Sequence, residues 1–211
     1  MTVLRSVQQI ADVMSAALWT DHRIVVGMAG SPAAGKSTVA EQLVDRLGAR
    51  AALLPMDGFH LPQARLVELG RRERMGAPDT FDVAAFLATL VGLRRGFGPS
   101  GQTISAPGFD RAQEEPVADE IHISPDISCV VVEGNYLLLE SDGWERVSPL
   151  LDLTFFVELG HETRLERLVA RHVRYGKSPT EALAWALGPD EANARLIEQT
   201  APRADHRVAL G

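Results

Sequence analysis

The sequence lacks several features that would tie the chain to an oxidising compartment or a membrane. It contains one cysteine, Cys129, so no disulfide can form within the chain, and its place in an apolar run indicates a buried thiol. No apolar stretch reaches the ~18 residues needed to cross a bilayer. The amino terminus does not show the basic and then apolar pattern of a signal peptide. We therefore expect a cytoplasmic protein.

The sequence also has fewer basic than acidic residues. The net charge is −7, which would repel nucleic acid and anionic lipid from most of the surface. Only Lys36 and Lys177 are lysines among the 21 basic residues. We therefore expect no nucleic-acid or membrane partner, and a local site for any phosphate.

Composition and length favour one globular unit. Hydrophobic residues make up 45% and charged residues 23% of the chain, which excludes a disordered or fibrous protein. A chain of 211 residues is long enough for one well-packed domain and short for two. We expect residues 1–211 to form a single domain.

Five short apolar segments are typical of buried strands. They are IVVGMAG (24–30), AALLPMD (51–57), CVVVEG (129–134), LTFFVEL (153–159) and HRVAL (206–210). Helical patterns lie between them, including residues 36–47 and a helix from Val83 with Asp82 as its N-cap. An amphipathic helix is also predicted over residues 3–18, from the spacing of Val3, Val7, Ile10, Met14 and Leu18. Strands that alternate with helices predict an α/β fold with a parallel sheet covered on both faces.

One segment departs from this alternation. TISAPGFD (103–110) and DEIHI (119–123) have the pattern of short strands or a hairpin, inserted at 99–125 before the third core strand. The insert could form a wall of a substrate site, or it could be an edge decoration of the sheet.

The segment GSPAAGKS is a full match to the phosphate-loop pattern G-x-x-x-x-G-K-[ST]. It follows a predicted strand and opens a predicted helix, so backbone N–H groups and the helix N terminus would face the same phosphates. Lys36 would reach the β- and γ-phosphates during catalysis, and the Ser37 hydroxyl would bind Mg²⁺. The residues predicted to bind the nucleotide are Gly30, Ser31, Pro32, Ala33, Ala34, Gly35, Lys36, Ser37 and Thr38.

Two acids end predicted strands at the edge of the sheet where the phosphate loop lies. Asp57 ends the second strand, and a carboxylate there can orient or accept the proton of an attacking hydroxyl. Glu133 ends the third strand and is predicted to hold Mg²⁺, directly or through water. Each acid could instead cap a helix or turn. A regulatory GTPase is disfavoured, because the chain has no N-K-x-D guanine signature.

Four arginines recur along the helix predicted after the fourth strand. Arg164, Arg167, Arg171 and Arg174 fall within an arc of about 80°, and no acid lies three or four residues from any of them. The triphosphate is one partner that would neutralise them, with Arg171 or Arg167 on a lid that excludes water. A solvated stripe that pairs with distant acids is the alternative.

The motifs GSPAAGKST, MDGFH, GAPDTFD, VVVEGNYLL and RLERLVARH together resemble the P-loop kinases grouped with uridine kinase, phosphoribulokinase and bacterial pantothenate kinase. The chain looks most like bacterial kinases encoded with fructose uptake systems, which are called fructokinases. The resemblance implies a three-layer P-loop NTPase fold, with about five parallel strands in the order 2-3-1-4-5 when 24–30 is strand 1. It also implies a helical lid at 171–186, with ATP and Mg²⁺ as cofactors.

The resemblance also assigns roles to single residues. Asp57 matches the family's base, Glu133 its metal-side acid and Arg171 its catalytic lid arginine, with Arg167 beside it at the ATP. In uridine kinases a Y-D-F segment followed by a histidine helps to hold the nucleoside. Phe109 and Asp110 fit that segment, but Glu114 stands in the place of the histidine. The residues expected on the substrate side are Phe59, His60, Asp79, Phe109, Arg111 and Tyr136.

Three hypotheses for function follow. The first is an ATP-dependent kinase that phosphorylates a hydroxyl of a small sugar or polyol, with fructose as the best candidate. The second is a kinase of uridine, another nucleoside or pantothenate. The third is a regulator that hydrolyses ATP slowly and has no acceptor. We expect a monomer or homodimer whose partner is a small molecule.

Overall fold

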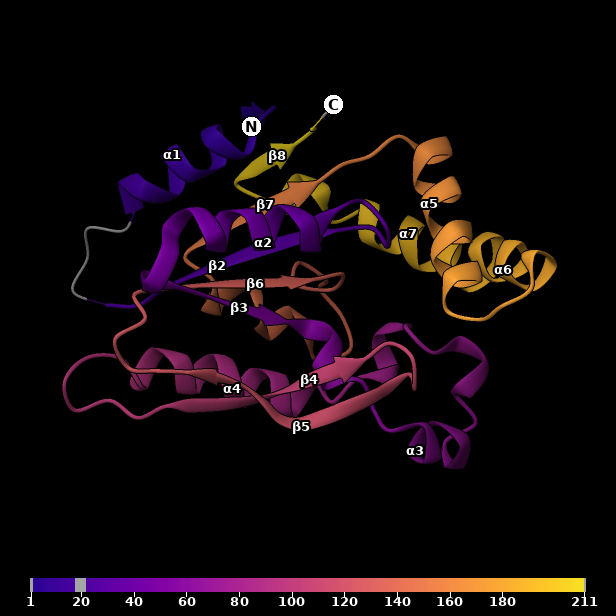
Figure 1. Cartoon of the computed structure of the whole chain (residues 1–211), viewed down its shortest axis with the longest axis horizontal. Helices are drawn as coiled ribbons and strands as arrows, with labels where there is room; N and C mark the ends of the chain where they lie inside the picture. Colours follow the sequence, from indigo (N-terminus) through magenta and orange to yellow (C-terminus); the bar gives the residue numbers. More distant parts are fainter. Residues whose placement is uncertain (1, 18–21, 211) are drawn as a thin grey trace.

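The computed structural model describes residues 2–17 and 22–210, and its centre is a six-stranded parallel sheet (Figure 1). The strand order is β1-β8-β7-β2-β6-β3. The strands are β1 (Thr2–Leu4), β2 (Ile24–Gly30), β3 (Ala51–Pro55), β6 (Cys129–Gly134), β7 (Leu153–Val157) and β8 (His206–Val208). Read from the β3 edge, five of them follow the predicted order 2-3-1-4-5, which confirms the predicted fold class.

The sixth strand corrects one prediction. Thr2–Leu4 pairs in parallel with His206–Val208 at the sheet edge, so Val3 belongs to a strand and α1 begins only at Val7. Leu4 is buried while Val3 is exposed, because successive strand residues face opposite sides. Leu18, the last residue of the predicted helical pattern, lies outside the described residues.

The central strand shows why the sheet is covered on both faces. Every residue of β2 is buried, and alternate residues enter different cores: Val25 lies in one hydrophobic cluster and Val26 in the other. Helices α1 and α2 cover one face, while α4 and a β-hairpin lie on the other (Figure 1). Asp82 caps α4 as predicted, since its carboxylate accepts a hydrogen bond of 2.9 Å from the Ala85 N–H.

The remaining elements include the predicted insert and three helices beyond the ends of the parallel strands. The predicted insert forms an antiparallel hairpin of β4 (Ile104–Asp110) and β5 (Glu115–Ile123), and α5 to α7 gather beyond the strand ends (Figure 1). In the part of the chain that the structure describes, no helix is long and apolar enough to cross a membrane. The helices are α1 (Val7–Ala17), α2 (Lys36–Leu47), α3 (Gln63–Glu68), α4 (Val83–Arg95), α5 (His161–Arg174), α6 (Pro179–Trp185) and α7 (Glu191–Glu198).

Candidate active site

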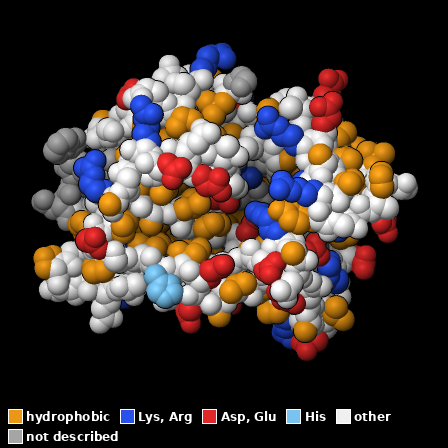
Figure 2. All heavy atoms as spheres, in the orientation of Figure 1, with side chains coloured by type: hydrophobic (Ala, Val, Ile, Leu, Met, Phe, Trp, Pro, Cys, Tyr) orange, Lys and Arg blue, Asp and Glu red, His pale blue; other side chains and the backbone are white. Residues whose placement is uncertain are grey.

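A cavity of about 750 Å³ opens at the carboxyl ends of the parallel strands, which is a typical size and place for a small-molecule site. Its walls come from the loops after β2, β3, β6 and β7, from the β4–β5 turn, and from α5 and the segment after it. Figure 2 shows basic and acidic side chains gathered about a hollow between the body of the molecule and its α5–α7 end. Charged groups therefore dominate its rim.

The phosphate loop forms one wall of this cavity. Gly30 and Gly35 have φ angles of 149° and 97°, which favour glycine, and a Cβ on Gly30 would lie 2.5 Å from the Val157 carbonyl oxygen. Ala33 takes φ 62°, an unusual angle for a residue with a side chain. Helix α2 begins at Lys36 with no side-chain cap, so its first N–H groups face the loop's concave side.

Lys36 is buried beside the loop. Its Nζ donates to the Ser31 carbonyl oxygen at 3.0 Å and to Asn135 Oδ1 at 2.7 Å. Burial lowers the pKa of Lys36 to about 8, although Glu133 and Asp57 favour its charged form. Asn135 was quoted in a sequence motif but given no role. It follows β6 directly, and its position at a strand end is the signal that could have identified it.

Ser37 and Glu133 form the second polar contact of the loop. The Ser37 hydroxyl donates to Glu133 Oε1 at 3.1 Å, and burial followed by repulsion from Asp57 raises the pKa of the Glu133 carboxyl. A hydroxyl and a buried carboxylate side by side fit a divalent cation that takes its other oxygen ligands from phosphate and water. Among residues 2–17 and 22–210 no group of three acidic, histidine or cysteine side chains could hold a metal without those ligands.

Asp57 lies on the same cavity as the phosphate loop. It occupies a 3₁₀ turn (Met56–Phe59) that follows β3 directly. Its side chain caps no helix and instead pairs with Arg111 from the hairpin, at 2.7 Å between Oδ2 and Nη2. Gly58 permits this arrangement, because a Cβ there would lie 2.0 Å from the Pro107 carbonyl oxygen. The glycine therefore serves the close approach of the hairpin.

The ion pair sets the charge of both groups. Burial, the largest single influence, acts to raise the pKa of Asp57 and to lower that of Arg111, but their mutual attraction together with other neighbouring groups outweighs burial in each case. The pKa of Asp57 consequently lies below its ordinary value, helped by His60, Lys36 and Arg171. Asp57 is an ionised carboxylate at neutral pH.

His60 supports the turn that carries Asp57. Its Nδ1 lies 2.8 Å from the Asp57 carbonyl oxygen, and its ring packs between Phe81 and Phe109 at centroid distances of 3.9 and 4.8 Å. Burial lowers the pKa of His60 below its ordinary value, so the ring is neutral at neutral pH. A carbonyl partner requires the proton on Nδ1. Nε2 is therefore an acceptor on a residue that lines the cavity.

The arginines of α5 divide into two groups. Arg167, Arg171 and Arg174 line the cavity, and within the described residues none of them has a hydrogen bond or ion pair. Arg167 Nη1 lies 3.7 Å from the position of a Cβ on Gly35, which places it against the phosphate loop. These three are free to meet an anionic ligand.

Arg164 behaves differently. It is 1% exposed and pairs with Glu191 at the start of α7, so this residue has a distant acid as its partner but is buried instead of solvated. Arg164 lies in the first turn of α5, next to α7. The spacing of the four arginines along the helix does not predict this contact. The Nε and Nη1 atoms of Arg164 are buried without a partner.

Comparison with known proteins identifies the family. No protein-family profile matches the chain. A uridine kinase named C227.14 from Schizosaccharomyces pombe, assigned without proof of activity, is 33% identical over 169 residues, which are 76% of this chain and 71% of that one. The crystal structure of a candidate fructose transport system kinase from Silicibacter sp. TM1040 has a TM-score of 0.87 at 32% identity and covers 96% of this chain and 98% of that one. The chain belongs to the P-loop kinases of the uridine kinase/phosphoribulokinase family. An ATP-dependent kinase-like protein, notR' from Aspergillus versicolor, is 38% identical over 133 residues, 61% of this chain and 77% of that one.

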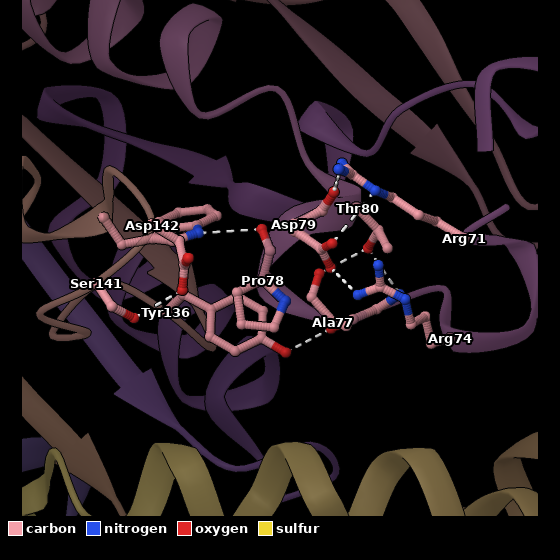
Figure 3. A network of polar contacts seen from close by, with 11 residues as sticks. Arg71, Arg74, Ala77, Pro78, Asp79, Thr80, Tyr136, Ser141 and Asp142 are labelled. Carbon is pink, nitrogen blue, oxygen red and sulfur yellow. Dashed lines mark hydrogen bonds and ion pairs between the residues drawn. The ribbon is translucent and has the colours of Figure 1, made fainter. Parts of the chain in front are cut away.

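Three residues expected on the substrate side of this kinase do not line the cavity. Phe59 is 3% exposed and packs edge to face on Phe86, because the turn after β3 directs it into the core. Tyr136 is fully buried, and its hydroxyl donates to the Gly76 carbonyl oxygen. The Asp79 carboxylate lies between the guanidinium groups of Arg71 and Arg74 (Figure 3). Tyr136 and Asp79 therefore help to hold the 71–80 loop in place.

The other three, His60, Phe109 and Arg111, do line the cavity. So do residues that were not proposed as site residues: Glu114 at the position of the family's histidine, His172, Lys177 and Trp185 within the predicted lid, and Arg72 and Asp190, which were given no role. Their contacts join separate segments: Arg72 meets Glu114 at 2.6 Å, and His172 Nε2 meets Asp190 Oδ2 at 2.6 Å. Such pairs have no local sequence signal.

Proposed function

We propose that this P-loop kinase transfers the γ-phosphate of ATP to a hydroxyl of a small sugar or polyol, with fructose as the first candidate. The observation that carries the proposal is the position of Asp57 on the same cavity as Lys36 and the phosphate loop. A hydroxyl held between them would lie beside both a carboxylate and the terminal phosphate.

The nucleotide side follows from the charges. Backbone N–H groups of the loop and the start of α2 would hold the phosphates, with Lys36 at the β- and γ-phosphates. Arg167 and Arg171, whose side chains have no hydrogen bond or ion pair within the described residues, would close over the triphosphate from α5 and neutralise the charge that develops during transfer.

Mg²⁺ fits beside Ser37 and Glu133. The Ser37 hydroxyl and the Glu133 carboxylate would hold the ion. A cation beside Glu133 would lower its raised pKa and so favour the charged carboxylate. When bound, Mg²⁺ would neutralise charge on the β- and γ-phosphates. These two residues also keep their contact with each other without the metal, so the pocket is already arranged.

Asp57 would act on the acceptor hydroxyl. Its low pKa makes it a weak base, which suits phosphoryl transfer because the transition state is loose and the hydroxyl proton leaves late. Orientation is then its main contribution. His60 would fix the backbone of the turn through Nδ1, and Arg111 would hold the carboxylate until the acceptor enters.

A nucleoside acceptor is the second candidate, favoured by the 33% identity to a protein named as a uridine kinase. Against it stands Glu114, a charged residue on the cavity wall at the hairpin turn. A screen of fructose, other sugars, polyols, uridine and pantothenate, read by ADP release and by the mass of the product, separates the candidates. Fructose or a polyol should raise turnover above the basal rate. A response to uridine alone would favour the nucleoside kinase, and no response at all would leave a slow ATPase.

A further inference from the structure

Glu114 occupies a specialised place on the cavity wall. It lies in the turn between β4 and β5 with φ 53°, a left-handed backbone angle that residues with side chains seldom take. Such angles persist where the surrounding structure holds them, and they are common in binding sites. Here the side chain of Gln63 fixes the turn, because its Nε2 donates to the Gln113 carbonyl oxygen at 2.6 Å. The turn is therefore held in the conformation that presents Glu114.

Two cations from other segments meet the Glu114 carboxylate. Arg72 Nη2 lies 2.6 Å from Oε2, and Lys177 Nζ lies 3.8 Å from Oε1. Both cations are themselves positioned. Arg72 Nε donates to Gln63 Oε1 at 3.1 Å, and the Lys177 ammonium lies over the Trp185 ring at 4.9 Å. The three charged groups line the same cavity as Asp57 and are arranged before any ligand binds.

The pairing of charges differs between the two ends of the cavity. Arg167, Arg171 and Arg174 on α5 have no ion pair within residues 2–17 and 22–210. By contrast, Arg111 is paired with Asp57, and Arg72 and Lys177 share Glu114. An anionic acceptor would have to displace a carboxylate from these cations. A hydroxyl can both donate to the carboxylate and accept from the cation, so it fits a site whose charges are already paired.

We propose that Glu114, together with Arg72 and Lys177, binds neighbouring hydroxyls of a neutral polyhydroxy acceptor and selects against acceptors that carry a carboxylate or phosphate. This inference rests on the proposed kinase function and names the substrate class of that site. Glu114 is a specificity residue here. It lies at the distal end of the acceptor, and the reacting hydroxyl lies at Asp57.

The first experiment compares acceptors that differ at one terminal carbon, which is a CH₂OH group in one member of each pair and a carboxylate in the other. ADP release from MgATP is measured with D-sorbitol against D-gluconate and with glycerol against D-glycerate, and with D-fructose, uridine and pantothenate alongside. At least one neutral polyol or sugar should give a kcat/KM about tenfold or more above that of its anionic counterpart. Higher activity with the anionic member of each pair would overturn the inference.

The second experiment uses matched carboxylate variants of the same hairpin. Glu114→Gln removes the charge but keeps the shape, while Glu120→Gln does the same on β5, away from the cavity lining. With the best neutral acceptor, Glu114→Gln should raise the acceptor KM about tenfold with a smaller change in kcat. Glu120→Gln should match the unaltered protein. Equal acceptor KM in the two variants would overturn the role of Glu114, provided that both unfold at similar temperatures.

The outcomes separate this inference from the proposed function. If pantothenate or another anionic acceptor raises ADP release and no neutral polyhydroxy acceptor does, ATP-dependent phosphotransfer holds and the inference about Glu114 is wrong. If no acceptor raises ADP release above the basal rate, the kinase function itself is wrong.

Discussion

The two ends of the active-site cavity are built in different ways. At the nucleotide end, one continuous segment from Pro32 to Thr38 lines the cavity, and three arginines of α5 have no side-chain hydrogen bond or ion pair within the described residues. At the acceptor end, the charged groups come from separate segments and are already paired, as Asp57 is with Arg111. The first end is prepared for a ligand of fixed shape and high negative charge. The charged groups of the second end lie on loops, so their identity and position can differ between relatives that share the fold.

Asp57→Asn tests the acceptor end most directly and should have the largest effect. We expect kcat to fall about 10³-fold, because the amide cannot orient or accept the proton of the acceptor hydroxyl as a carboxylate does. MgATP affinity, measured by calorimetry, should change little, since the phosphate loop is untouched. A variant with near-normal turnover would remove Asp57 from the mechanism.

Arg171→Ala tests the nucleotide end of the cavity. Removing a free cation from the cavity should lower kcat about 10²-fold, as expected for the loss of one group that stabilises transition-state charge. The free energy of unfolding should hardly change, because the Arg171 side chain makes no hydrogen bond or ion pair within the described part of the chain. Equal losses of activity and stability would show that Arg171 is structural.

Arg164→Met is the matched variant on the same helix. It leaves Glu191 without its buried partner and should cost about 3 kcal/mol in the free energy of unfolding, measured by urea denaturation. The kcat of the folded fraction should stay within about twofold, because Arg164 does not line the cavity. A large loss of turnover without a loss of stability would place Arg164 in the active site after all.

These contrasts explain which parts could be predicted from the sequence. The phosphate loop and the central strands were predictable because each depends on a local pattern, as in Gly30–Ser37 or the apolar run of β2, whereas the strand order was predicted only from the family resemblance. The charge pairs of the acceptor end were not predictable, since Asp57 meets Arg111 across 54 positions and Arg72 meets Glu114 across 42. Contacts of that kind depend on where loops lie after folding.

The errors have the same origin. Phe59 and Asp79 stand in motifs close to true cavity residues, and spacing alone does not tell which side of a turn a side chain faces. Val3 fits a helical pattern by its spacing, but the carboxyl-terminal strand β8 offers it a partner that only the fold brings near. In each case the local sequence is compatible with two conformations, and contacts with a distant segment determine which one forms.

A change of pH should have the smallest effect on kcat/KM for ATP. It distinguishes the nucleotide end of the cavity, where Lys36 titrates, from the acceptor end, where Asp57 stays ionised. Burial lowers the pKa of Lys36 to about 8, so its ammonium is charged below that pH and loses its proton as the pH rises through it. The value of kcat/KM for ATP reports the free enzyme, and it should fall up to about tenfold per pH unit above about pH 8. Lys36→Arg keeps its charge over this range, so its lower activity should not decline in the same way. The ionised Asp57, whose pKa is lowered, should add no change between about pH 6 and about pH 9. A flat profile for the unaltered protein would mean that the charge of Lys36 is kept by its neighbours, and that the nucleotide end is as fully paired as the acceptor end.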